Sequence, residues 1–220
     1  VGAPVVFDSA GKYGAGLALE TLGRALRDLG ARPSDVVISN KLGWLRVPLR
    51  GPEPTFEPGA WKDLSHDAEQ RIDGDGIIEC WRQGNELLGG GFEAGLVSVH
   101  DPDEYLAAAS GPADRRRRFD QILAAYGALG ELRAAGRVRA VGVGSKDWTV
   151  IREIAEAVDL DWAMLACSLT VYRHPQELLD FVERLRGRGV GIVNSAVFHA
   201  GFLTGGEFFD YRRPDPRADR

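Results

Sequence analysis

The stretch VVFDSAGKYGAG at residues 5–16, followed by LALETLGRALRDLG at 17–30, decides the class of fold. It opens on an apolar, β-branched run, which predicts a buried strand at 4–9. Leucines recur at helical spacing in its second half, which predicts a helix over 16–30. Tyr13 lies between the two in a glycine-flanked loop. A strand, a loop and a helix in succession form the repeating unit of α/β folds.

The same unit recurs along the rest of the chain. Further strands are predicted at 35–41, 96–100, 138–143, 162–168 and 190–197, and further helices at 75–88, 118–135, 148–158 and 175–188. Such alternation implies a parallel sheet with right-handed crossovers. The sheet is either an open, doubly wound one or a closed barrel. No G-x-G-x-x-G fingerprint follows the first strand, which favours the barrel.

We expect one barrel domain over residues 1–205. Residues 44–74 are predicted to form a long loop, because their first part is rich in Gly, Pro and Trp. Residues 206–220 are polar and rich in Pro and Arg, and they are predicted to be a loop or a disordered tail.

The composition is that of an ordinary globular protein. Of 220 residues, 44% are hydrophobic and 27% are charged, and the net charge of −5 gives no reason to expect nucleic acid as a partner. No apolar run reaches the roughly 18 residues of a membrane span, so no membrane partner is expected. The basic run at 115–118 lies beside acidic residues and predicts a solvated helix start.

The cysteines and histidines indicate neither a disulfide framework nor a metal site. Cys80 and Cys167 form no CxxC pair, and two cysteines fit a reducing cytoplasm. His66, His174 and His199 lack ligand-type spacing, so no metal is expected.

Nearly every predicted strand ends in a polar or ionisable residue. These residues are Asp8 and Ser9, Asn40 and Lys41, His100 and Asp101, Ser145 and Lys146, Ser168, and Asn194 and Ser195. Polar residues can simply mark where a strand meets solvent. In a parallel barrel, however, active sites lie at the carboxyl ends of the strands. An acid, a lysine and a histidine that end three successive strands are therefore predicted to converge at one mouth.

Such a cluster can move a proton. Tyr13 follows Asp8 in the loop that leaves the same strand, so it can reach the same mouth. A tyrosine has a pKa near 10, and a neighbouring ammonium is expected to lower it by stabilising the phenolate. A carboxylate would hold the lysine, and a histidine would orient a substrate oxygen. Together these groups could transfer a proton to or from oxygen while a hydride moves at carbon.

These residues resemble the aldo-keto reductase family in five blocks, which occur in the family's order. The blocks are FDSAGKYGAG at 7–16, LGRAL at 22–26, ISNKLG at 38–43, His100 at a strand end, and GRVRAVGVG at 136–144. The resemblance implies a (β/α)8 TIM-type barrel, of which about six strands are visible here. It also implies an NAD(P)-dependent oxidoreductase with a small-molecule sugar or carbonyl substrate.

Two further stretches, HDPD at 100–103 and AVFHAGFLTG at 196–205, resemble one branch of the family. It is the L-fucose dehydrogenase and D-threo-aldose 1-dehydrogenase branch, which is galactose dehydrogenase-like. This likeness implies oxidation of an aldose's anomeric hydroxyl to a lactone, with NAD or NADP as hydride acceptor. NADPH-dependent reduction of aldehydes or ketones is one alternative, and a non-catalytic barrel scaffold is another.

The resemblance also implies roles for individual residues. Asp8, Tyr13, Lys41 and His100 match the family's catalytic residues, with Tyr13 as general acid/base, Lys41 and Asp8 tuning it, and His100 orienting the substrate oxygen. The positions implied to bind the cofactor are Ser145, Asn194, Ser195, Val197 and Phe198. Trp44 and Trp61 are expected either to line a sugar pocket or to anchor the long loop.

Overall fold

The computed structural model describes residues 4–57, 60–210 and 213. The strands are β1 (Val5–Ala10), β2 (Val36–Leu42), β3 (Trp44–Pro48), β4 (His66–Gln70), β5 (Leu96–His100), β6 (Ala140–Ser145), β7 (Trp162–Ala166) and β8 (Gly191–Ser195). The helices are α1 (Leu17–Asp28), α2 (Gly74–Leu88), α3 (Pro102–Ala107), α4 (Pro112–Ala134), α5 (Trp148–Ala157) and α6 (Gln176–Gly187), with short 3-10 turns at Pro33–Asp35 and Phe202–Thr204. Within the described residues, no helix is both long and apolar enough to cross a membrane.

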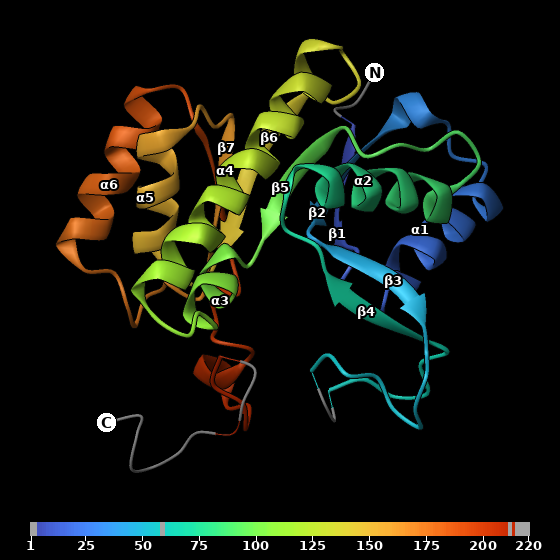
Figure 1. Ribbon diagram of the computed structural model, residues 1–220, viewed down its shortest axis with the longest axis horizontal. Coiled ribbons are helices and arrows are strands. Elements are labelled where there is room, and N and C mark those ends of the chain that lie inside the picture. The colour runs from blue at the N-terminus through green and yellow to red at the C-terminus, as the bar shows by residue number, and fades with distance from the viewer. Residues whose placement is uncertain (1–3, 58–59, 211–212, 214–220) are drawn as a thin grey trace. The chain divides into compact units, whose positions relative to one another are not determined.

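The order of the strands identifies the fold. Six strands form one sheet in the order β1-β2-β5-β6-β7-β8, which is their order along the chain (Figure 1). A doubly wound sheet reverses its strand order at a switch point, whereas a (β/α) barrel adds each new strand beside the last. The sheet therefore has barrel topology with six of the eight strands of a complete barrel. The prediction of an incomplete (β/α)8 barrel is confirmed.

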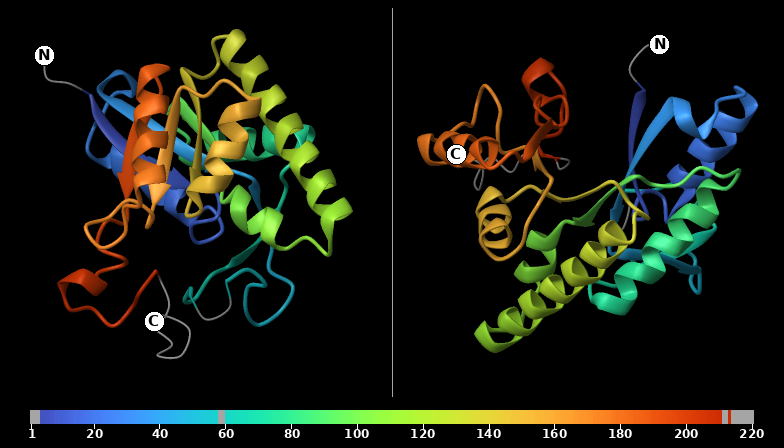
Figure 2. Two further views of the ribbon diagram at one scale, coloured as in Figure 1. Left: turned by 90° about the vertical axis from the view of Figure 1, so that its left-hand side faces the viewer. Right: turned by 90° about the horizontal axis from the view of Figure 1, so that it is seen from above.

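The chain divides into two compact units, Val1–Gly142 and Val143–Arg220. In the first, β1 pairs in parallel with β2, and β2 pairs in parallel with β5. Helices α1 and α4 both pack against α2, and Figure 2 shows α4 alongside α2. In the second unit, β7 and β8 pair in parallel, and Trp148 of α5 lies 6.0 Å from Phe181 of α6 between ring centroids.

The stretch 44–74, predicted to be a long loop, contains two strands. Strands β3 and β4 form an antiparallel pair, with Trp44 opposite Gln70. The segment between these strands, where it is described, and residues 71–73 are irregular. Strand β4, HDAEQ, is polar and short of β-branched residues, so its sequence carries no strand pattern. Its partner strand and the packing of Ala68 in a small apolar cluster hold it extended.

The first strand is less buried than its apolar sequence predicts. Val5 and Val6 are 58% and 61% exposed, and only the end of β1 is buried. The strands β1 and β8 lie at the two edges of the sheet, and β8 is also largely exposed. An apolar run does not tell whether its strand is central or at an edge, because both carry β-branched residues.

Two helices begin at prolines that the periodicity did not indicate. Helix α3 was not predicted, and α4 begins at Pro112 rather than at 118. Proline suits the first turn of a helix, where its missing N–H is not needed. Arg115, Arg116 and Arg117 are exposed in the first turns of α4, as predicted for the basic run at 115–118. Arg118 differs, because its side chain is 20% exposed and donates to the Tyr105 carbonyl at 3.0 Å.

The contact between α1 and α2 depends on Gly23. A Cβ placed on Gly23 would lie 1.9 Å from the carbonyl oxygen of Leu88, which is far closer than atoms can approach. The glycine thus lets α1 approach the end of α2, and α1 in turn begins directly after the loop that carries Tyr13.

We expect Gly23→Ala to lower the free energy of unfolding by about 1–3 kcal/mol, because the backbone of α2 must move to admit the methyl group. Urea unfolding followed by circular dichroism measures this change. Gly127→Ala in α4 is the matched control, because a Cβ there meets nothing within 4 Å and alanine favours the helix. A stability loss of equal size in both variants would contradict the interpretation.

Candidate active site

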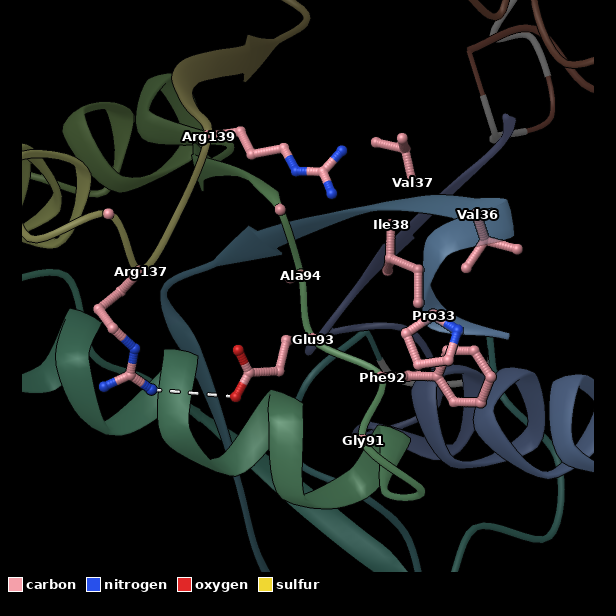
Figure 3. A pocket seen from close by; sticks show the side chains of 12 residues that line it. Pro33, Val36, Val37, Ile38, Gly91, Phe92, Glu93, Ala94, Arg137 and Arg139 are labelled. Atoms are coloured by element: carbon pink, nitrogen blue, oxygen red, sulfur yellow. Dashed lines mark ion pairs between the residues drawn. The ribbon is translucent and has the colours of Figure 1, made fainter. Parts of the chain in front are cut away.

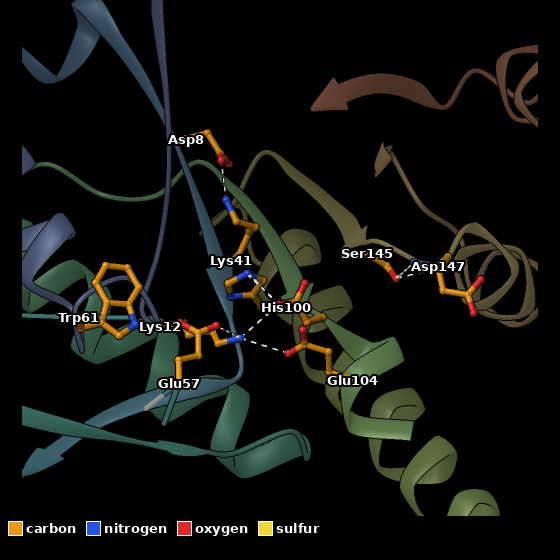
Figure 4. Close-up of polar contacts among 10 residues, drawn as sticks. Asp8, Lys12, Lys41, Glu57, Trp61, His100, Glu104, Ser145 and Asp147 are labelled. Carbon is orange, nitrogen blue, oxygen red and sulfur yellow. Dashed lines mark hydrogen bonds and ion pairs between the residues drawn. The ribbon is translucent and has the colours of Figure 1, made fainter. Parts of the chain in front are cut away.

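The four side chains expected to carry the chemistry come together in the first unit, and Figure 4 shows three of them, Asp8, Lys41 and His100. Lys41 at the end of β2 forms an ion pair with Asp8 of β1, which also accepts a hydrogen bond from the Ser39 hydroxyl at 2.9 Å. The Lys41 Nζ lies 4.8 Å from the centroid of the Tyr13 ring. That ring meets the His100 ring edge-on, with 5.6 Å between centroids.

The strand register and one turn explain this convergence. Ala10 lies opposite Lys41, and Lys41 lies opposite Ser98 on β5, so the carboxyl ends of three strands are level. After β1 the chain turns sharply, with Tyr13 donating its backbone N–H to the Ala10 carbonyl at 3.1 Å. The next residues, 14–16, all have positive φ angles of 51–82°, which the two glycines favour. The turn directs Tyr13 back over the ends of the strands.

The pKa of Tyr13 is shifted opposite to the sequence-based expectation. Burial of the phenol, with the negative charges of Asp8 and Asp101, raises its pKa to about 12. The Lys12 ammonium does lower this pKa, as a neighbouring ammonium was expected to, but burial and the carboxylates outweigh it, so the expected net lowering is wrong. The physical reason is that Lys41 is already neutralised by Asp8, while burial disfavours the charged phenolate. Tyr13 is accordingly a protonated phenol at neutral pH.

A second lysine, Lys12, was not singled out from the sequence. Its side chain is 4% exposed, and its Nζ lies 2.7 Å from Glu57, 3.1 Å from Glu104 and 3.4 Å from Asp101. Burial alone would lower its pKa, but the hydrogen bond to Glu57 and the nearby carboxylates raise it above the ordinary value. A lysine in a glycine-flanked loop normally lies in solvent, and nothing near Lys12 in the sequence indicates burial.

The tryptophans of residues 44–74 belong to an aromatic group that anchors this segment. The rings of Trp44 and Phe56 lie 6.0 Å apart, and those of Phe56 and Trp61 lie 6.3 Å apart, between centroids. Trp61 donates its indole N–H to Glu57 at 2.8 Å. These contacts support the anchoring alternative for both tryptophans, while a role in lining a sugar pocket stays a prediction.

The residues expected to bind the cofactor lie in the second unit. Ser145 is 1% exposed at the end of β6, and its hydroxyl donates to the Asp147 carbonyl at 3.2 Å. The Asn194 amide donates to the Leu169 carbonyl at 2.9 Å. Phe198 is 56% exposed, and Ser195 and Val197 are partly buried beside it in the chain.

His199 connects the segment after β8 to the residues that follow β7. Its Nε2 lies 2.9 Å from the Thr170 hydroxyl, and its Nδ1 lies 2.6 Å from a carboxylate oxygen of Asp210. The Phe209 ring stacks on the imidazole at 4.5 Å. Of the predicted tail at 206–220, residues 211–212 and 214–220 lie outside the described part. The segment just before them is held by these contacts.

A cavity of about 270 Å³ opens at the other end of the strands (Figure 3). It is lined by Pro33, Val36, Val37, Ile38, Gly91, Phe92, Glu93, Ala94, Gly95, Gly136, Arg137 and Arg139. These residues belong to the amino end of β2, to the turn before it and to the loops that precede β5 and β6, so the cavity is separate from Tyr13. Across the described residues, no group of His, Cys, Asp and Glu side chains suits a metal ion.

Comparisons with known proteins agree with this geometry. The profile of the Aldo/keto reductase family matches residues 5–220. A pyridoxal 4-dehydrogenase of Microbacterium luteolum is 32% identical over 221 residues, covering 93% of this chain and 61% of that protein. A D-threo-aldose 1-dehydrogenase of a Pseudomonas species is 30% identical over 213 residues, covering 91% and 57%. The chain thus spans about three fifths of the length of both relatives.

Solved structures show the same fold at lower identity. A glycerol dehydrogenase from Gluconobacter oxydans superposes with a TM-score of 0.61 at 20% identity, over 97% of this chain and 56% of that one. An aldo-keto reductase from Bacillus halodurans superposes with a TM-score of 0.61 at 22% identity, over 96% and 56%. The partial coverage agrees with the six strands counted here.

The raised pKa of Tyr13 predicts a stability change at alkaline pH. Between about 10 and about 12 the unfolded chain ionises this phenol while the folded chain keeps it protonated, so stability falls as the pH rises. Tyr13→Phe removes this contribution, and its free energy of unfolding should fall less steeply than that of the wild type from pH 9 to about 11. Urea unfolding at several pH values measures the slope. Tyr172→Phe, at an exposed position, is the control, and equal slopes for Tyr13→Phe and the wild type would contradict the assignment.

Proposed function

The chain belongs to the aldo/keto reductase family, and from that premise we propose that it is an NAD(P)-dependent oxidoreductase acting on a cyclic hemiacetal. The preferred substrate is an aldose of the L-fucose or D-threo-aldose type, whose anomeric hydroxyl is oxidised to a lactone. The observation that carries the proposal is the joint placement of the Asp8–Lys41 ion pair, Tyr13 and His100. Identity of 30% to a D-threo-aldose 1-dehydrogenase supports the choice of sugar.

In this proposal Tyr13 exchanges the proton of the reacting oxygen, and His100 orients that oxygen by a hydrogen bond. Asp8 and Lys41 hold the rings in place, because the ammonium lies over the face of Tyr13. Oxidation requires Tyr13 to accept a proton, so the phenol must first ionise. With a pKa of about 12 for Tyr13, the phenolate is scarce at neutral pH, and oxidation should become faster as the pH rises.

The proposed cofactor is NAD or NADP, held by Ser145, Asn194, Ser195, Val197 and Phe198. When bound, its nicotinamide ring supplies the hydride acceptor. One buried group of the second unit fits such a ligand. The Ser168 hydroxyl, which follows β7, is buried without a hydrogen-bond partner among the described residues. Buried hydroxyls normally have a hydrogen-bond partner, and in this proposal the Ser168 hydroxyl bonds to an amide group of the cofactor.

Pyridoxal is a second candidate substrate. It forms an internal hemiacetal between its aldehyde and the neighbouring hydroxymethyl group, so its oxidation also gives a lactone. The 32% identity to a pyridoxal 4-dehydrogenase favours it. Reduction of aldehydes or ketones with NADPH is a third candidate reaction, supported by the protonated state of Tyr13, which suits a proton donor.

The buried, free Cys80 and Cys167 support a reducing compartment, and we place the protein in the cytoplasm.

Steady-state assays should separate these substrates. We expect formation of NAD(P)H at 340 nm with L-fucose or another aldose, more slowly with pyridoxal, and no NADPH oxidation of comparable rate with simple aldehydes. Quenching of tryptophan fluorescence by NAD and by NADP provides a test that is independent of turnover. A non-catalytic scaffold would give neither signal, and that result would refute the proposal.

Tyr13→Phe should lower kcat by about two to four orders of magnitude, because it removes the group that exchanges the proton. Cofactor quenching should persist, since Tyr13 is not among the residues assigned to the cofactor. Trp148→Phe, at a site that packs α5 on α6, is a control for unspecific loss of activity. Turnover of Tyr13→Phe at the wild-type rate would exclude Tyr13 as acid/base.

A further inference from the structure

We propose that Lys12 is a positioning residue that holds the Glu57 segment, by which we mean the described residues of 53–64, against the turn that carries Tyr13, and that this segment forms a wall of the substrate site. The effect of this segment on substrate binding rests on the proposed function. The attachment of the segment by Lys12 is a property of the folded chain, so it can be measured without an activity assay.

The first contact is a bridge through one carboxylate. One oxygen of Glu57 lies 2.7 Å from the Lys12 Nζ, and the other accepts the Trp61 indole N–H at 2.8 Å. Figure 4 shows Glu57 between Lys12 and Trp61. The lysine therefore fixes both the carboxylate and, through it, the tryptophan of the same segment.

The second contact joins Lys12 to the start of α3. Its Nζ lies 3.1 Å from Glu104 in the first turn and 3.4 Å from Asp101 at the N-cap. Asp101 also lies 3.5 Å from the His100 imidazole. One ammonium thus connects three segments that are far apart in the sequence, of which the turn contains Tyr13 and the start of α3 follows His100.

Apolar packing assists the attachment but does not replace it. Phe56, next to Glu57, is 5% exposed and packs with Ala15 and Ala68, and the Lys12 ammonium lies 5.0 Å from the Trp44 ring centroid. Loss of the ion pair should therefore loosen the Glu57 segment without unfolding the unit.

The segment also lies close enough to act on the reacting group. Lys12 directly precedes Tyr13, and Phe56 of the segment packs in one apolar cluster with Ala15, two residues after Tyr13. In line with this packing, the charge of Glu57 contributes to the raised pKa of the phenol. A substrate whose oxygen meets Tyr13 would thus lie beside the Glu57 segment. Its position decides how well that substrate is held.

Two glutamates make a matched comparison. Glu57 and Glu104 both pair with Lys12, and their side chains are 38% and 39% exposed, but only Glu57 belongs to the segment. In Glu57→Ala we expect amide hydrogen exchange over 53–64 to accelerate by about tenfold, the equivalent of one hydrogen bond to a charged group. In Glu104→Ala the exchange of these residues should stay as in the wild type.

Measuring KM and kcat separately distinguishes a loss of substrate positioning from a general loss of stability. Glu57→Ala should raise KM for the aldose by about tenfold with kcat changed by less than about twofold, because binding is lost while Tyr13 and His100 are intact. Lys12→Met should reproduce this split, and Lys12→Arg, which keeps the charge, should restore KM.

Unchanged exchange in Glu57→Ala, or equal acceleration over 53–64 in Glu104→Ala, would overturn the proposal. A lower kcat with an unchanged KM in Glu57→Ala would also overturn the proposal. If the wild type turns over none of the substrates, the proposed function fails, and the exchange data still decide the role of Lys12. Should Lys12→Met fail to fold, Glu57→Ala and Lys12→Arg carry the test.

Discussion

A lysine buried among strands requires a counter-charge, and this requirement at Lys41 governs how the first unit is assembled. Its side chain is 3% exposed, and its ion pair with Asp8 connects the end of β2 to β1. Side chains alternate across a strand, so a slip of one residue between β1 and β2 would turn Lys41 to the opposite face and leave its charge unpaired. Charge thus reinforces the register in which Asp8 lies opposite Ser39. The same register brings the strand ends level, which is what places Tyr13 and His100 in contact.

Because both lysines are paired with carboxylates, they do little to lower the pKa of Tyr13. Lys41 is bound to Asp8, and Lys12 is bound to three carboxylates, so neither offers an uncompensated positive charge to Tyr13. Burial and the acidic neighbours then dominate, and the pKa of the phenol rises to about 12. A phenol in this state carries the proton that a donor needs, but its raised pKa makes it a weaker acid than an ordinary tyrosine. It accepts a proton only at higher pH or when a bound cation stabilises its ionised form.

Most of the regular structure could be predicted, because it follows from local periodicity. The strand Leu96–His100 has the predicted bounds, and α1, α2, α5 and α6 begin and end within two residues of those predicted. The errors share a cause. Strand β4 is polar and is held extended by its partner, and the exposed start of β1 depends on its place at the edge of the sheet. Neither fact is visible in a window of neighbouring residues.

From the sequence alone follow the succession of strands and helices, the family, and the grouping of Asp8, Tyr13, Lys41 and His100. These conclusions rest on short patterns and on residues at strand ends, whose meeting is implied by parallel pairing. Only the folded chain revealed that Lys12 is buried among acids, that Tyr13 stays protonated, and that Trp61 is bound to Glu57. Burial and charge act through space, so they depend on segments that are distant along the chain and adjacent in the fold.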